Sequence, residues 1–196
     1  KAEHYMLHPV TIKQDEQMSK YASVLPYGKD SAGNVYLLLG QERHAPGYAS
    51  SDRWSDFGGM SEADETLRAA AARECYEESM GLLGTQSELE RALNEQLSFA
   101  ATGPSGGRHY LLRVPLNDDV VQHFSRFYHY ARCSAALHSL TLPHNDSGMF
   151  EKQAIRWVPL RAVADVERSG QLPLRYWFRK TLFEQIENPR SVLYRL

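Results

Sequence analysis

A strongly helical segment that carries three glutamates near its end is the feature that most constrains this chain of 196 residues. Residues 64–80 are rich in Ala, Leu, Glu and Arg, which are good helix formers, and Gly81 follows them as a stop signal. At about 100° per residue, Glu74, Glu77 and Glu78 fall within an arc of about 100° on one helical face. Acids near the start of the segment suit a helix N-terminus. The sequence therefore predicts a helix with one acidic face.

That face changes from apolar to acidic along the helix. Its earlier turns carry Leu67, Ala70 and Ala71, which are expected to pack on a sheet. Carboxylates three or four residues apart repel each other, and one arginine, Arg73, cannot neutralise three of them. Clustered carboxylate oxygens suit a hard divalent cation such as Mg²⁺. On the glutamates alone, a solvated acidic helix end with Arg73 paired to Glu77 is the competing interpretation.

Strand and helix patterns alternate irregularly along the rest of the chain. This arrangement indicates an α/β layered domain rather than a helix bundle or a β-sandwich. The predicted strands are 23–27, 35–39, 97–102, 109–115 and 154–158; the predicted helices besides 64–80 are 88–96, 118–138, 160–168 and 174–187; and 41–56 is a predicted loop.

The composition excludes several classes of protein. Hydrophobic residues make up 42% and charged residues 23%, as in ordinary globular proteins, and no apolar run approaches the roughly 20 residues that cross a bilayer. We therefore expect no membrane partner. The two cysteines, Cys75 and Cys133, stand in no metal or redox spacing, which excludes a disulfide scaffold and favours a reducing compartment. We expect a cytoplasmic protein, and a nuclear one is also compatible.

Charge is unevenly distributed although the formal net charge is only −2. Residues 52–95 hold eleven acidic residues against four arginines, and residues 151–196 hold nine Lys and Arg against five acids. An acidic site beside a basic neighbour would suit a polyanionic substrate bound through metal ions. Solvated faces of opposite sign are the alternative.

Glycine and charged residues stand at fixed spacings around the acidic helix. Gly59 is separated by five residues from Glu65, and seven further residues lead to the run RECYEE at 73–78. This pattern, from 59 to 82, resembles the signature of the Nudix hydrolases, G-x5-E-x7-R-E-U-x-E-E-x-G-U, in which U is a bulky apolar residue. Every charged position and the first glycine match in register.

Two positions depart from that signature. Ser79 and Met80 both stand between the last glutamate and Gly81, where the signature has one residue, so we expect the helix cap to shift by one residue. Cys75 occupies a position where larger aliphatic residues are common, and we interpret it as a buried structural residue.

The resemblance implies an α/β Nudix fold, in which a mixed β-sheet is sandwiched between α-helices. A single domain would span residues 1–196, with a core at about 21–165 and a C-terminal helical extension at about 170–190. The resemblance also implies that Glu74, Glu77, Glu78 and the carbonyl of Gly58 bind Mg²⁺, for which Mn²⁺ could substitute.

Gly59, Glu65 and Arg73 are given structural roles by the same resemblance, holding the loop and the helix together. A second, shorter match starts at Glu151, where residues 151–160 resemble the late Nudix segment E-x5-W-x-x-L. Glu151 would then belong to the site, or else be a solvated loop acid. Glu74, Glu78 and Glu151 are the candidate catalytic residues, with the general base either Glu74 or Glu151.

The expected reaction is attack of an activated water on phosphorus in a nucleoside diphosphate linked to another moiety. Capped RNA, dinucleoside polyphosphates, nucleotide sugars and inositol pyrophosphates all remain open as substrates. Arg43 and His44 are candidate substrate-binding residues, or else exposed loop residues, and Arg175 is one of several cations that could line a phosphate-binding rim. The competing function is a catalytically silent module of the same fold that binds a nucleotide or RNA.

Overall fold

The computed structural model describes residues 20–137 and 148–196, and its centre is one seven-stranded sheet. Strand β1 is the central member, because it pairs with β2 and β4 in antiparallel fashion and with β6 in parallel. The sheet is therefore mixed, as the sequence predicts. The strands are β1 (Tyr21–Lys29), β2 (Val35–Glu42), β3 (Trp54–Ser55), β4 (Phe57–Met60), β5 (Ser98–Ala100), β6 (Gly107–Arg113) and β7 (Lys152–Pro159).

The two halves of β1 have different neighbours along one edge. Its first half, from Tyr21 to Val24, pairs with β4, whereas the end of the strand, from Tyr27 to Lys29, pairs with β2. β7 lies along the other edge of β2, and β3 joins the end of β2. The chain from β3, which pairs with β2, therefore passes to β4, which pairs with β1, and β4 contains the glycines that precede the acidic helix.

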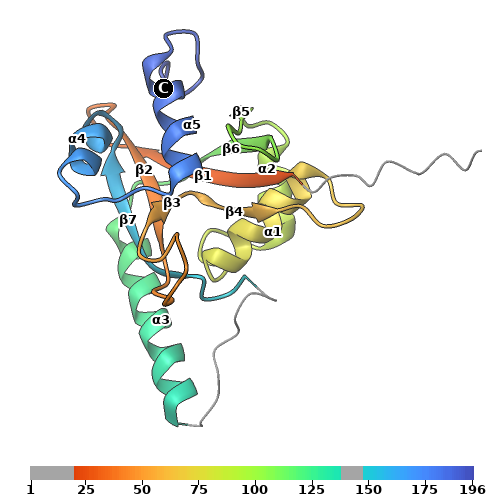
Figure 1. Cartoon of the computed structure of the whole chain (residues 1–196), viewed down its shortest axis with the longest axis vertical. Helices are drawn as coiled ribbons and strands as arrows, with labels where there is room; N and C mark the ends of the chain where they lie inside the picture. Colours follow the sequence, from red (N-terminus) through yellow and green to blue (C-terminus); the bar gives the residue numbers. More distant parts are fainter. Residues whose placement is uncertain (1–19, 138–147) are drawn as a thin grey trace, which may run out of the picture.

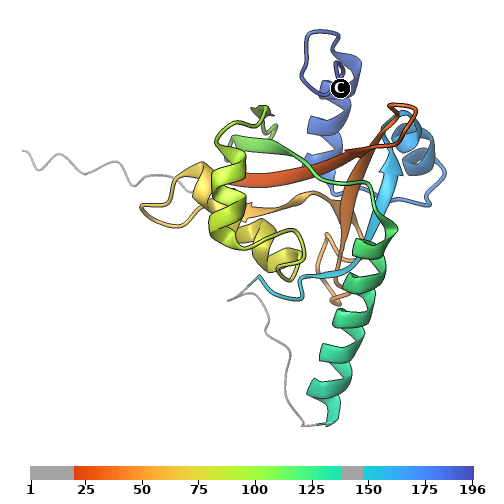
Figure 2. The ribbon, with the colours of Figure 1, turned by 180° about the vertical axis from the view of Figure 1, so that it is seen from behind.

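Helices cover both faces of this sheet (Figures 1 and 2). Successive strand residues point to opposite faces, so Val24 and Leu25 enter two separate apolar clusters. The Val24 cluster includes α1, α2 and the start of α3, and the Leu25 cluster includes α4 and α5. The predicted α/β fold with a mixed sheet between helices is confirmed. The helices are α1 (Leu67–Glu78), α2 (Gln86–Leu93), α3 (Asp118–Leu137), the 3₁₀ turn Leu160–Ala162 with α4 (Val163–Arg168), and α5 (Tyr176–Glu187).

Helix α1 begins at Leu67, so the predicted start at residue 64 was wrong. Thr66 is the N-cap, and its side chain accepts a hydrogen bond from the N–H of Ala69, whereas Asp64 adopts a positive φ of 65° that no helix contains. Ala70 and Ala71 are fully buried against the sheet. Their small side chains let the helix lie close to β1 and β4, which brings its acidic end against the glycines of β4.

The end of α1 also differs from the expectation, because the cap is not shifted. The N–H of Gly81 bonds to the carbonyl of Tyr76, and the N–H of Met80 bonds to that of Glu77, which is the Schellman pattern. Met80 takes the left-handed position, with φ of 54°, where the Nudix signature has its glycine. Met80 is buried in the core, and this burial offsets the cost of the left-handed backbone.

The loop predicted at 41–56 is shorter than expected, because strand residues occupy both of its ends. β2 continues to Glu42, and Trp54 pairs with Gln41 in β3. The polar residues that suggested a loop are paired inside the sheet, since Ser55 donates a hydrogen bond to Glu42. Other predicted elements are present with ends shifted by at most three residues, and His138, the expected last residue of α3, lies outside the described residues.

The C-terminal segment packs on the sheet beside β3. The N–H of Trp54 bonds to the carbonyl of Pro173, and the N–H of Arg175 bonds to that of Trp54. Leu172, Leu174 and several side chains of α5 are buried in the Leu25 cluster. These contacts place Arg175 beside the end of β2. Among the described helices, none is long and apolar enough to cross a membrane.

Candidate active site

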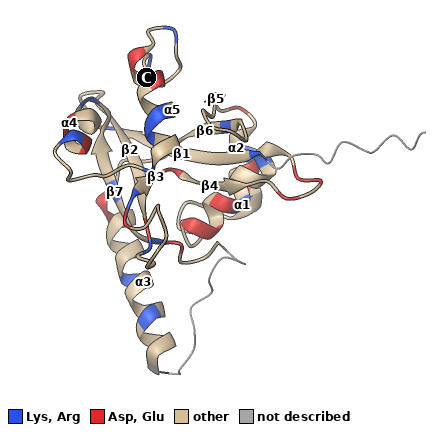
Figure 3. Cartoon of the chain, viewed as in Figure 1, with Lys and Arg blue, Asp and Glu red and all other residues tan. Residues whose placement is uncertain are grey.

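Acidic residues mark the ribbon of α1 (Figure 3). Its glutamates Glu74 and Glu78 lie against the glycines of β4, and Glu78 is the more deeply buried of the two. Its carboxylate accepts a hydrogen bond from the N–H of Gly58 at 2.7 Å through Oε2, and its Oε1 lies 3.2 Å from Nζ of Lys152. Lys152 is completely buried at the start of β7, immediately after Glu151. Both oxygens of Glu78 are therefore engaged by the protein itself.

Lys152 lies between two acids. Its Nζ donates to Oε1 of Glu42 at 2.5 Å and to Oγ of Ser55 at 2.9 Å, in addition to its contact with Glu78. A Cβ at Gly40 would lie 2.9 Å from the aliphatic stem of Lys152, so glycine makes room for that stem. Burial alone would lower the pKa of Lys152, but Glu78 and Glu42 raise it above its usual value. The side chain is therefore a buried ammonium.

Arg73 joins the helix to the loop before it. Its Nη2 donates to Oε2 of Glu65 at 3.1 Å and to the carbonyl of Met60 at 3.3 Å, and its Nη1 donates to Oε1 of Glu74 at 2.8 Å. Glu77 lies farther from the same guanidinium, at 3.5 Å. The position of Glu74 is thus set by a residue that also fixes the loop.

The two glycines before the helix are required by close contacts. A Cβ at Gly58 would lie 2.2 Å from Cβ of Ser23 and 2.6 Å from the carbonyl oxygen of Ala22, so only glycine fits there. A Cβ at Gly59 would lie 2.5 Å from Oε1 of Glu74. Gly59 therefore lets the Glu74 carboxylate approach the loop backbone.

The carboxylates of this site are short of positive charge. Burial raises the pKa of Glu74, although Arg73 opposes the shift, and burial raises the pKa of Glu77 to about 7 against the same guanidinium. Burial, followed by the charge of Glu74, raises the pKa of Glu151. Burial also raises the pKa of Glu78 well above its usual range despite the opposing charge of Lys152. The basic residues of the site therefore offset its negative charge only in part.

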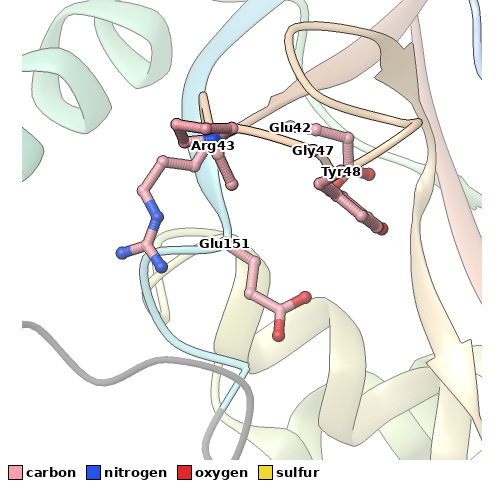
Figure 4. Close-up of a pocket in the computed structure, with 7 residues that line it drawn as sticks. Glu42, Arg43, Gly47, Tyr48 and Glu151 are labelled. Carbon is pink, nitrogen blue, oxygen red and sulfur yellow. The ribbon is translucent and has the colours of Figure 1, made fainter.

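A cavity of about 570 Å³ lies beside this cluster, and we call it the Glu151 cavity. Figure 4 shows Glu151 on one side and Tyr48 with Glu42 on the other, while the guanidinium of Arg43 points away from these two residues. The loop after β2 forms the remaining wall. The lining residues are Glu42, Arg43, Ala45, Pro46, Gly47, Tyr48 and Glu151.

The predicted substrate-binding residues differ in their placement. Arg43 lies on the wall of the Glu151 cavity. His44 is outside the lining set, and its Nδ1 lies 2.6 Å from Oδ2 of Asp52 on the exposed side of the loop. The structure thus brings Glu74, Glu77, Glu78 and Glu151 into mutual electrostatic range but leaves His44 apart from them.

The carboxylate oxygens of the glutamates determine whether a divalent cation fits this site. Carboxylate oxygens are the ligands that Mg²⁺ prefers, and the raised pKa values of Glu77 and Glu151 indicate uncompensated negative charge. As the side chains stand, no three Asp, Glu, His or Cys residues of the described ranges are grouped closely enough to hold one ion. The donor chemistry fits a cation, and small rotations of the glutamates would be needed to complete its ligands.

Four site residues were missed by sequence reasoning or given another role: Glu42, Ser55, Lys152 and Arg175. Glu42 and Lys152 are directly opposite each other where β2 pairs with β7, and Nη1 of Arg175 lies 3.2 Å from Oε1 of Glu42. The lysine that follows Glu151 was the sequence signal for these charge contacts. It could not be assigned a partner, because neither strand alone shows that β2 pairs with β7.

Comparisons with known proteins agree with this architecture. A family model described as the NUDIX domain matches residues 20–180. A comparison with curated proteins finds no match.

Three solved structures are similar to this chain at low sequence identity. A NUDIX hydrolase from Alicyclobacillus acidocaldarius has 16% identity and a TM-score of 0.49, with 88% of this chain and 92% of that chain covered. A C. elegans Ap4A hydrolase in a binary complex has 19% identity and a TM-score of 0.46, covering 86% and 95%. A bifunctional NMN adenylyltransferase/ADP ribose pyrophosphatase from Francisella tularensis, complexed with AMP and a Mn ion, has 17% identity and a TM-score of 0.49, covering 86% and 41%.

Proposed function

Because the chain belongs to the NUDIX domain family and is a Nudix hydrolase, as the motif at 59–82 indicates, we propose that it cleaves the diphosphate linkage of a nucleoside diphosphate joined to another moiety. The observation that carries this proposal is the group of four partly uncompensated carboxylates, Glu74, Glu77, Glu78 and Glu151, next to the Glu151 cavity. Such a group suits a divalent cation with a phosphate-bearing substrate.

Glu74, Glu77 and Glu78, together with the carbonyl of Gly58, are the proposed ligands of Mg²⁺ or Mn²⁺. When bound, a divalent cation would offset the charge of phosphate oxygens and acidify a water molecule. Lys152 holds Glu78 at the end of the helix through an ion pair, and its ammonium offsets part of the negative charge of the site. Arg73 and Glu65 position Glu74 and the loop carbonyls rather than touching the substrate.

Glu151 is the better supported of the two candidate general bases. Its carboxylate belongs to the wall of the Glu151 cavity and forms no ion pair with any described residue, whereas Oε1 of Glu74 is held by Arg73 at 2.8 Å. Burial also raises its pKa, and a carboxylate with a higher pKa is a stronger base. The water proton would pass to Glu151 as the water oxygen attacks phosphorus, and the bond to the bridging oxygen would break to release two phosphorylated products.

The size of the Glu151 cavity, about 570 Å³, falls within the range of about 300–1,000 Å³ that is usual for small-molecule sites. Its wall includes the ring of Tyr48, so a flat group could be accommodated. A small-molecule diphosphate is therefore the proposed substrate. Capped RNA remains in the substrate panel because the C-terminal part of the chain is basic.

A turnover assay tests the proposal. The full chain is incubated with dinucleoside polyphosphates, nucleotide sugars, capped RNA and inositol pyrophosphates in Mg²⁺ or Mn²⁺, in parallel with Glu78→Gln, Glu77→Gln and Glu151→Gln. We expect at least one substrate to be cleaved and each variant to lose activity by about 10²-fold or more. Glu95→Gln, which changes an exposed acid after α2, is the matched control and is expected to keep full activity.

Two outcomes contradict the proposal. The hydrolytic function is wrong if no substrate in the panel is turned over, and a silent nucleotide- or RNA-binding module would then be the better description if the same compounds bind. The assignment of the site is wrong if the glutamate variants, shown to be folded by circular dichroism, are as active as Glu95→Gln.

A further inference from the structure

A second group of buried polar side chains lies on the α5 side of the sheet, within electrostatic range of Glu78. Asp56 is fully buried; its Oδ1 accepts a hydrogen bond from the hydroxyl of Tyr21 at 3.0 Å, and its Oδ2 lies 2.5 Å from Nδ1 of His109. Ser23 bonds to the same Oδ2, and its Oγ lies 2.7 Å from that Nδ1. Neither the proposed metal ligands nor the proposed base belongs to this group.

The hydrogen bonds of this group determine the orientation of His109. Oδ2 of Asp56 bonds to Nδ1 of His109 and to Oγ of Ser23, so the contact with Asp56 occupies Nδ1 of the ring. The other ring nitrogen, Nε2, has no hydrogen bond to any described residue, so it is available to a ligand. The ring is held by Phe99, stacked at a centroid distance of 5.0 Å, and by Phe178 at 6.3 Å.

His109 lines a cavity of about 230 Å³, which we call the His109 cavity. Its wall includes Tyr21, Met60, the turn 101–106 and the start of α5. Two large aromatic side chains at that start are unusually exposed, Tyr176 by 67% and Trp177 by 46%. An open aromatic surface beside a polar cavity is a common feature of sites that bind flat ligands.

Arg175 connects this cavity with the proposed active site. It lines the His109 cavity, while its Nη1 holds Oε1 of Glu42, which lines the Glu151 cavity. The two cavities therefore lie on either side of one ion pair. At about 230 Å³ the His109 cavity is smaller than the usual range for a whole drug-sized ligand, and it suits one ring system of a larger substrate.

We propose that the His109 cavity binds the planar heteroaromatic ring of the substrate, and that Nε2 of His109 selects it through a hydrogen bond to the polar edge of the ring. This inference rests on the proposed function, because the ring belongs to the same diphosphate compound. Tyr176 and Trp177 supply the surfaces on which a ring stacks, and Arg175 supplies donors for a ring carbonyl or nitrogen. Aromatic faces together with a histidine nitrogen and the donors of a guanidinium match the polar edge of a nucleobase.

Isothermal titration calorimetry in EDTA tests this without any turnover. The probes are AMP, GMP, CMP and UMP, with ribose 5-phosphate as the control that lacks a base. We expect at least one nucleotide to bind the full chain at least tenfold more tightly than ribose 5-phosphate. His109→Phe keeps the stacked ring but removes Nε2, and we expect it to weaken that binding by tenfold or more. Trp177→Leu is expected to weaken it by at least threefold, and Phe127→Leu, an exposed aromatic on α3, is the matched control.

Each result decides the question. The inference is overturned if no nucleotide binds more tightly than ribose 5-phosphate, or if His109→Phe and Trp177→Leu both bind as the parent does. If His109→Phe does not fold, Trp177→Leu against Phe127→Leu decides alone. Calorimetry requires no metal. Nucleotide binding that depends on His109 would therefore support the ring site even if no compound in the turnover panel were cleaved. An active enzyme whose two variants bind nucleotides as tightly as the parent does would refute only the ring site.

Discussion

Nζ of Lys152 lies 3.2 Å from Oε1 of Glu78, and both side chains are almost completely inaccessible to solvent. The contact links the first residue of β7 to the last residue of α1. Two buried charges stabilise a fold only when each offsets the desolvation cost of the other, so the pair is expected to be sensitive to the loss of either partner. A glutamate that the sequence assigns to metal binding is thus also part of an internal ion pair.

Lys152→Met should destabilise the fold by about 3–5 kcal/mol, because it leaves Glu78 and Glu42 buried without the ammonium between them. The double variant Lys152→Met with Glu78→Gln should recover part of that loss, since one orphaned charge is removed. Urea unfolding followed by circular dichroism measures both free energies. The control is Arg168→Met, which breaks an exposed ion pair with Asp165 and should change stability by less than about 1 kcal/mol. Equal effects in Lys152→Met and Arg168→Met would contradict the prediction.

The sequence was sufficient to predict the helix of glutamates and the layered α/β fold. The helix is readable because its residues have high helix propensity and because the spacing of Glu74, Glu77 and Glu78 is a local property of one element. The mixed sheet followed from the resemblance to a family. Its exact pairing did not follow, since β1 has three neighbours that come from distant parts of the chain.

What the sequence could not provide are the partners of buried charges. Glu42 was placed in a loop because charged and small polar residues surround it, yet it belongs to a strand whose neighbour carries Lys152. Met80 was interpreted as an extra residue, although it occupies the left-handed cap position itself. In both cases the deciding energy is burial and pairing across the fold, which overrides the preference of the residue type in isolation.

Neighbouring glycines should respond differently to the same substitution. Gly58→Ala places a Cβ 2.2 Å from Cβ of Ser23 and against strand backbone, so we expect loss of the fold. Gly59→Ala meets the flexible end of Glu74 at 2.5 Å, so we expect a folded protein in which that carboxylate is displaced and the turnover rate falls by about 10-fold or more. Thermal melting together with the turnover assay separates the two results. A folded Gly58→Ala, or a fully active Gly59→Ala, would contradict this account of the loop.

The helix cap at Met80 predicts an unusual order of stabilities. Met80→Ala loses the buried side chain and keeps the left-handed strain, so it should cost about 2–3 kcal/mol. Met80→Gly loses the same burial but relieves the strain, so it should cost about 1 kcal/mol less than Met80→Ala. Glycine is normally the more destabilising of the two within helices, so this order in urea unfolding would be specific to the cap. The opposite order would show that Met80 is not strained.

Glu65 should give the protein a pH-dependent stability. Burial alone would raise the pKa of Glu65, but hydrogen bonds from Arg73 and from the N–H of Glu62 outweigh burial and lower it below 4.5. Because the pKa is lower in the folded state, the stabilisation is fully present above the unfolded value and is lost as the pH falls through the folded value. Glu65→Gln should therefore cost about 1–2 kcal/mol at pH 7, as expected for a charge-assisted pair that is mostly buried, and progressively less as the pH falls through the folded pKa of Glu65.

The comparison of Glu65→Gln with the parent is made by urea unfolding at several pH values between 3 and 7. The control is Glu95→Gln, whose exposed carboxylate lies outside every ion pair of the described residues. If the difference in unfolding free energy between Glu65→Gln and the parent stays constant over this range, the charge of Glu65 does not join the loop to Arg73. The hydrogen bonds alone would then hold the loop. A difference that closes toward low pH, absent in Glu95→Gln, would identify the ion pair as the link that positions Glu74.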